Sequence, residues 1–178
     1  MRPSMFSRMR ATASRRRPTA GGGGGSFFGF NGAVTGGFPS NNGRLLVTRW
    51  TLPVAATLVS LEFTTFNTAT NPGQAKGVIL ASSAGEPTTV LYVTAAQTAP
   101  AGGAVLTFTL TGSLAAGDYY LGGIVDTFSN NVGQGDAGAF ETRMANGTFN
   151  FATPPGTWPG TDASYVVPIA VKVNYTPS

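Results

Sequence analysis

The sequence predicts an all-β protein: a jelly-roll-like sandwich of two sheets, with about eight antiparallel strands and an extended basic N-terminal arm. The chain has 25 glycines and 12 prolines, and only 10% of its residues are charged, which is typical of a turn-rich β protein and not of a helix bundle. Apolar residues recur at every second position in short runs, which is the period of a half-buried strand. Turn sequences such as NPGQ, AGEP and APAGG separate the runs.

Eight runs carry this period-two pattern and are the predicted strands. In the clearest of them, Leu106, Phe108 and Leu110 alternate with Val105 and the threonines that follow it. The predicted strands are 45–50, 58–66, 78–81, 90–94, 105–110, 119–125, 140–144 and 165–175. Pro168 falls inside the last run and predicts a bulge or a sheet edge there, because proline has no N–H to donate.

Charge divides the chain into an arm and a body. Residues 1–17 carry six arginines and no carboxylate, whereas residues 18–178 carry five basic and seven acidic side chains, a net charge of −2. We expect three parts: an Arg-rich anchoring arm at 1–20, a Gly-rich linker and wrapping segment at 21–43, and the sandwich at 44–178. The phenylalanines between 27 and 38 are expected to wrap the body or a neighbouring subunit.

Composition excludes several kinds of chemistry. The chain has no cysteine and no histidine, so it has no disulfide, no thiolate metal site and no Ser-His-Asp or Cys-His arrangement. Its acids are scattered singly and are expected on the surface, at Glu62, Glu86, Asp118, Asp126, Asp136, Glu141 and Asp162. We therefore expect no enzymatic activity, no cofactor and no metal. No apolar run approaches the length of a membrane span, so no membrane partner is expected.

Three motifs of the body stand in a distinctive order and spacing. A hairpin sequence lies at 78–87, the strand entry LAAGDYYL at 114–121, and a closing strand IAVKVNYTP at 169–177. In these motifs the chain resembles a module of tailed-phage virion proteins over roughly residues 44–177, although Leu80 and Tyr120 stand where the family usually has tyrosine and tryptophan. Members are jelly-roll-like modules of head decorations, fibres and minor tail proteins, often assumed to touch host glycans. The resemblance implies a virion surface protein.

Three roles follow for the arm and the body. In the first, the arm docks on other virion proteins, the capsid lattice or tail subunits, because arginine pairs well with carboxylates and apolar side chains can anchor the contact. The anchoring residues would be Arg2, Met5, Phe6, Arg8, Met9, Arg10, Arg15, Arg16 and Arg17. In the second, less favoured role, the arm binds packaged nucleic acid. In the third, the body binds a host-surface glycan. A homo-oligomer such as a trimer is expected.

Trp158 is the candidate glycan contact on the body. It lies in a loop rich in proline and glycine, where an exposed ring could stack on a sugar. The alternative is that Trp158 covers the sheet core beside Pro155 and Pro159, which is the more common role of a large aromatic side chain. Trp50 and Phe63 are expected in or at the edge of the core, as are Phe108 and Tyr119.

Overall fold

The computed structural model describes residues 26–39, 43–67, 73–126, 130–147 and 149–178. These residues form fourteen strands and no helix. The strands make two sheets of seven strands each, and every pairing between neighbouring strands is antiparallel. The predicted all-β class and the two-sheet sandwich are confirmed.

Sheet A is built around the long strand β4, which has β14 on one side and β8 on the other. At its two ends β4 also pairs with β9 and with β11, and β1 and β2 form the outer edges beyond β14 and β11. The strands of sheet A are β1 (Ser26–Gly29), β2 (Gly36–Pro39), β4 (Ala56–Asn67), β8 (Ala104–Thr109), β9 (Ser113–Leu114), β11 (Asn130–Gln134) and β14 (Val171–Pro177).

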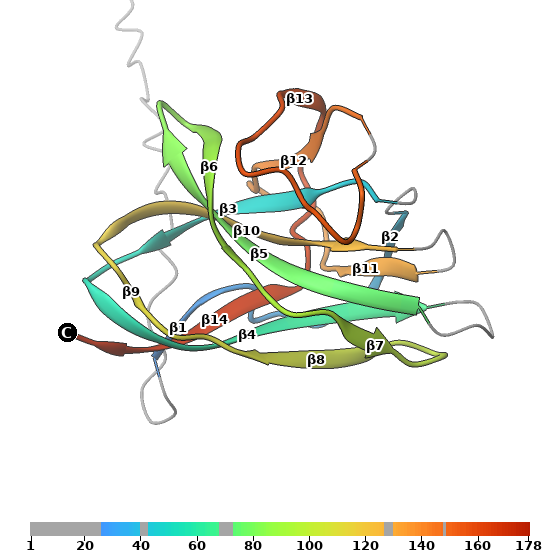
Figure 1. Cartoon of the computed structure of the whole chain (residues 1–178), viewed down its shortest axis with the longest axis horizontal. Helices are drawn as coiled ribbons and strands as arrows, with labels where there is room; N and C mark the ends of the chain where they lie inside the picture. The colour runs from blue at the N-terminus through green and yellow to red at the C-terminus, as the bar shows by residue number, and fades with distance from the viewer. Residues whose placement is uncertain (1–25, 40–42, 68–72, 127–129, 148) are drawn as a thin grey trace, which may run out of the picture.

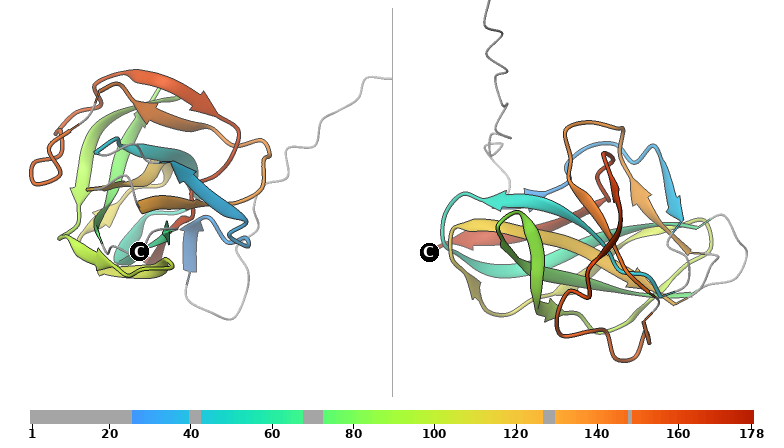
Figure 2. Two further views of the ribbon diagram at one scale, coloured as in Figure 1. Left: turned by 90° about the vertical axis from the view of Figure 1, so that its right-hand side faces the viewer. Right: turned by 90° about the horizontal axis from the view of Figure 1, so that it is seen from above.

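Sheet B is built around β10, which lies between β3 and β5. The sheet continues from β3 to β12 and β13 on one side and from β5 to β6 on the other, and β7 also pairs with β5. Its strands are β3 (Leu46–Leu52), β5 (Gly73–Ser83), β6 (Glu86–Val93), β7 (Gln97–Ala99), β10 (Gly117–Val125), β12 (Thr142–Ala145) and β13 (Thr161–Tyr165). In Figure 1, β3 and β10 lie above β4, β14 and β8, and Figure 2 shows the strands curving round a common interior.

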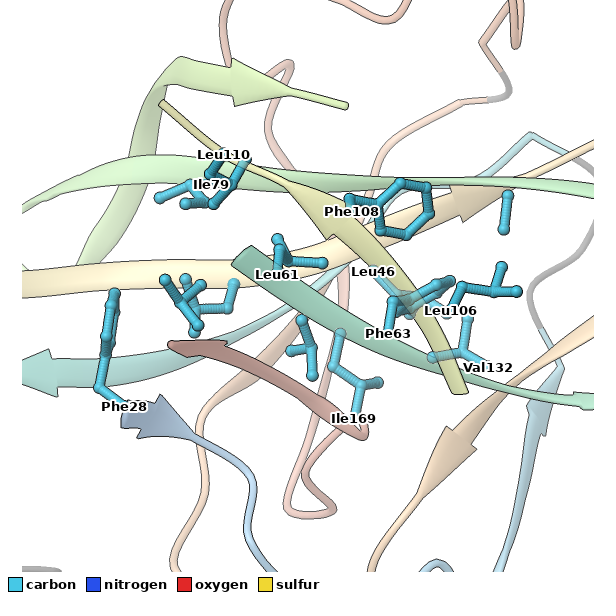
Figure 3. Packing of buried hydrophobic residues seen from close by; sticks show 14 of the residues in the cluster. Phe28, Leu46, Leu61, Phe63, Ile79, Leu106, Phe108, Leu110, Val132 and Ile169 are labelled. Carbon is cyan, nitrogen blue, oxygen red and sulfur yellow. The ribbon is translucent and has the colours of Figure 1, made fainter. Parts of the chain in front are cut away.

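The main hydrophobic core fills the space between the sheets. Sheet A contributes Leu61 and Phe63 from β4, and sheet B contributes Leu46 from β3 and Ile79 from β5. Figure 3 shows these side chains meeting between the layers, with Leu106 and Phe108 of β8 beside them. The core forms because successive side chains of a strand point to opposite faces, so each apolar run presents one row of its side chains inward.

Sheet B is buried on its other face as well. The residues that alternate with the core residues form a second buried cluster: Leu45, Val47, Val78, Leu80, Tyr120, Ile124 and Ala145. This cluster is covered by the cover segment, which we define as residues 149–160, through Phe149, Phe151 and Trp158. The cover segment lies over sheet B at the upper right of Figure 1. Strand β10 is therefore apolar on both faces, as is typical of a strand covered on both sides.

The single strand predicted at 165–175 is wrong. The segment holds the end of β13 in sheet B and the start of β14 in sheet A, joined by a turn that contains Pro168. The chain leaves sheet B there because proline cannot donate to a ladder. Two buried threonines hold the turn. Thr48 accepts a hydrogen bond from the Ile169 N–H, and Thr142 donates one to the Val167 carbonyl.

The strands that lack a counterpart among the eight predicted runs are short, and two of them, β1 and β2, lie in the predicted wrapping segment. β1 pairs with β14, and β2 pairs with β11. Phe28 and Phe38 of these strands are buried in the main core of the same chain. Residues 26–39 therefore complete sheet A. The other strands without a predicted counterpart are β7, β9 and β11.

Candidate functional site

The predicted anchoring residues lie outside the described residues. They are Arg2, Met5, Phe6, Arg8, Met9, Arg10, Arg15, Arg16 and Arg17. The structure therefore bears on the role of the arm only through the charges on the surface of the body.

Trp158 lies in the cover segment, half-buried against the second cluster. Its backbone N–H donates to the Thr88 carbonyl of β6 at 2.6 Å, and its indole N–H donates to the Thr161 hydroxyl at 3.3 Å. Lys76 of β5 fixes the other end of the segment, donating to the Phe151 carbonyl at 2.9 Å and lying 4.9 Å from the centre of that ring. In this geometry the indole ring acts as a cover of the sheet.

Leu80 and Tyr120 are the two positions at which the sequence lacks the tyrosine and tryptophan of the motifs compared above. They are neighbours in register on β5 and β10, and both are 0% exposed. The Tyr120 hydroxyl donates to the Gly85 carbonyl in the β5–β6 turn at 2.5 Å. Burial raises the pKa of Tyr120. Both side chains are used in packing, and neither is available as a ligand platform.

Every lysine and arginine of the body already has a partner. Four of the five cations form ion pairs with carboxylates: Arg44 with Asp162, Arg49 with both Asp118 and Glu141, Arg143 with Glu86, and Lys172 with Glu62. The fifth cation, Lys76, donates to two backbone carbonyls of the cover segment. The described part of the body therefore presents no unengaged cation, and its basic side chains serve to join separate segments of the fold.

Arg49 brings together two acidic residues that lie far apart in the sequence and were expected singly on the surface. Its guanidinium contacts Asp118 at 2.5 Å and Glu141 at 2.9 Å. The Thr51 hydroxyl donates to Asp118 at 2.6 Å, and this bond together with Arg49 lowers the pKa of Asp118. A carboxyl group of lowered pKa is ionised at neutral pH and is unsuited to act as a general acid. The cluster is an ion-pair network that ties β3 to β10.

A hollow of about 210 Å³ lies on the outer face of sheet A. Its floor is the start of β14 and the neighbouring part of β4, where Glu62 and Lys172 lie opposite each other in register. One wall is the connection from β1 to β2, with Phe30, Asn31 and Val34 among its residues, and Val105 of β8 forms the other. We call this hollow the sheet A groove.

The sequence predicts few of the groove residues. Alternation along 58–66 places Glu62 on the face opposite Leu61, but only the pairing of β4 with β14 brings Lys172 beside it. The connection between β1 and β2 carries no strand pattern that would place Phe30 over this face.

Two kinds of feature are absent from the described residues. No group of three His, Cys, Asp or Glu side chains there could hold a metal ion. No helix of a length and apolarity that would cross a membrane occurs in that part of the chain. Comparison of the chain with protein-family models, with curated proteins and with solved structures finds no match.

Proposed function

We propose that this chain is a non-enzymatic structural protein of a bacteriophage virion, held on the particle surface by its N-terminal arm. The observation that carries the proposal is the separation of charge. The arm has six arginines and no carboxylate, whereas each of the five basic side chains of the body is already engaged in an ion pair or a hydrogen bond. Attachment to an acidic surface is therefore the task of the arm.

We also propose that the sandwich is a jelly roll. Eight strands, β1, β3, β4, β5, β6, β8, β10 and β14, are numbered one to eight in chain order. Sheet A then has the order 1-8-3-6 and sheet B the order 2-7-4-5. This order supports the assignment, because it is what two interlocked Greek keys produce in an eight-stranded jelly roll. Jelly rolls are the usual fold of viral capsid and lectin domains, and the fold alone does not select between them.

The arm is expected to dock on other virion proteins as part of a homo-oligomer. Arginine pairs with carboxylates through two parallel hydrogen bonds, and the apolar residues Met5, Phe6 and Met9 can anchor such a contact. An enzymatic role has no support. The chain has no histidine or cysteine, and the two acids that meet, Asp118 and Glu141, share one guanidinium.

A second candidate function is that the arm binds packaged nucleic acid. The observation in its favour is that the arm precedes the first strand of the proposed jelly roll through a run of five glycines. Six arginines predict a slope of about −5 for the logarithm of affinity against the logarithm of salt concentration on duplex DNA.

The test compares the full chain with a variant lacking residues 1–20 and with one in which all six arm arginines are glutamine. We expect the full chain to co-sediment with phage particles and both variants to remain in the supernatant as folded proteins. Incorporation of either variant at the level of the full chain would refute anchoring by the arm. Binding of the full chain to DNA with the steep salt slope, without binding to genome-free particles, would select the second candidate.

A further inference from the structure

We propose that the sheet A groove binds one unit of a neutral saccharide. The proposal concerns a different surface from the arm and does not depend on the proposed function. The groove is a mixed site: its floor offers a carboxylate and an ammonium group, and its walls offer apolar side chains.

The two charged side chains of the floor are held in place and still have free bonding capacity. Glu62 accepts a hydrogen bond from the Asn174 amide at 2.7 Å on one carboxylate oxygen and pairs with Lys172 at 3.0 Å through the other. Each carboxylate oxygen can accept a further hydrogen bond, and the ammonium group has three N–H donors. Lys172 also lies 5.8 Å from the centre of the Phe27 ring, which limits its movement. The side chains of Glu62 and Lys172 are 26% and 29% exposed.

An acceptor next to a donor matches two neighbouring hydroxyl groups of a sugar ring. One hydroxyl can donate to Glu62 while the next accepts from Lys172, so that both bonds are charge-assisted. Asn31 and Thr64 also line the groove and add an amide and a hydroxyl group. The arrangement favours a ligand with several hydroxyl groups over one with a single polar group.

The charge of the groove selects a neutral ligand. Glu62 and Lys172 cancel each other, and among the residues that the structure describes no further charged side chain lines the hollow. An anionic or cationic ligand would meet a group of its own sign beside its counterion. The walls add apolar surface for the C–H face of a sugar ring, from Phe30, Val34 and Val105, the last of which is 57% exposed.

The experiment uses the full ¹⁵N-labelled chain and a panel of methyl glycosides of glucose, galactose and mannose. We expect at least one to bind with a Kd in the millimolar range, and the amide signals that shift to be those of residues 30–34, 62–64 and 170–172. Methyl glucuronide, the anionic counterpart of methyl glucoside, should bind more weakly. No shift at about 50 mM of any neutral glycoside, tighter binding of the glucuronide, or shifts centred on Trp158 would each overturn the proposal.

Variants test the role of the ion pair. Glu62→Gln and Lys172→Met each remove a charge-assisted bond while keeping most of the side chain, so affinity should fall at least about tenfold. Asp162→Asn breaks an exposed ion pair on sheet B and should leave affinity unchanged. If a floor variant does not fold, Val105→Thr takes its place in the test. Val105 is 57% exposed, so this variant should keep the fold, and its binding should weaken several-fold. Unchanged affinity in the folded groove variants would overturn the proposal.

Discussion

We expect replacement of a buried threonine by valine, which has nearly the same shape, to lower the free energy of unfolding strongly at Thr48 or Thr142. Thr48 and Thr142 are both 0% exposed. The Thr48 hydroxyl oxygen accepts from the Ile169 N–H at 3.0 Å, and it lies 2.6 Å from that of Thr142, which donates to the Val167 carbonyl at 2.6 Å. The hydrogen of Thr48 must therefore point to Thr142. Thr48→Val leaves the Ile169 N–H buried without a partner and removes the bond between the threonines, which together should cost about 2–4 kcal/mol.

Urea unfolding of the single variants and of the double variant is the assay. Thr142→Val should cost a similar amount, because it leaves the buried Thr48 hydroxyl without its acceptor and the Val167 carbonyl without its donor. The double variant should cost less than the sum of the two, by about 1 kcal/mol, because both single variants lose the same shared bond. Thr109→Val, on the exposed face of β8, is the control and should change stability by less than about 0.5 kcal/mol. Additive single effects, or a Thr48→Val protein as stable as the control, would refute this hydrogen-bond chain.

Three further predictions concern stability. Stability should fall as the pH drops below about 4, because the hydrogen bond from Thr51 and a neighbouring guanidinium lower the pKa of Asp118 in the folded chain, so that the unfolded chain binds the proton more readily. Thr51→Val should flatten this dependence in unfolding curves recorded across that range, and an unchanged profile would contradict the assignment. Gly122→Ala should strongly destabilise the protein, because a Cβ there would collide with the β3 backbone. Gly156→Ala is the control, since a Cβ there meets no atom within 4 Å and should leave stability unchanged. Equal melting temperatures of the two variants would disprove this prediction. Trp158→Ala should cost about 1–2 kcal/mol in urea unfolding by exposing the second cluster, and full stability would mean that the indole ring does not cover it.

Much of the fold follows from local pattern. Each of the eight predicted runs overlaps a strand, because alternation of apolar and polar residues reports which face of a strand is buried. The pattern gives the wrong result around Pro168, where two apolar runs separated by a turn look like one long strand. It misses β1 and β2, because Gly29, Gly36 and Gly37 interrupt any alternation.

The arrangement of the groove could not be predicted, because it depends on which strands pair. Glu62 and Lys172 are separated by more than half of the chain and meet only through the register of β4 with β14. Arg49 likewise meets its two carboxylate partners only through the tertiary fold, since they come from β10 and from the residue before β12. Sequence patterns place these side chains on a face, and only the tertiary pairing makes them a site.

Burial of sheet B on both faces also determines which positions of the protein tolerate substitution. In β10 the side chains at Leu121, Ile124 and Val125 have no exposed surface, so a polar substitution there would place an unpaired polar group inside one of the two apolar clusters. Sheet A, by contrast, has a solvent face on β4, β8 and β14, where exposed side chains outside the groove, such as Thr107 and Thr109, can be exchanged at little cost in folding stability. New surface properties can therefore arise on this face by substitution while the sandwich keeps its architecture, and a library of variants should be concentrated there.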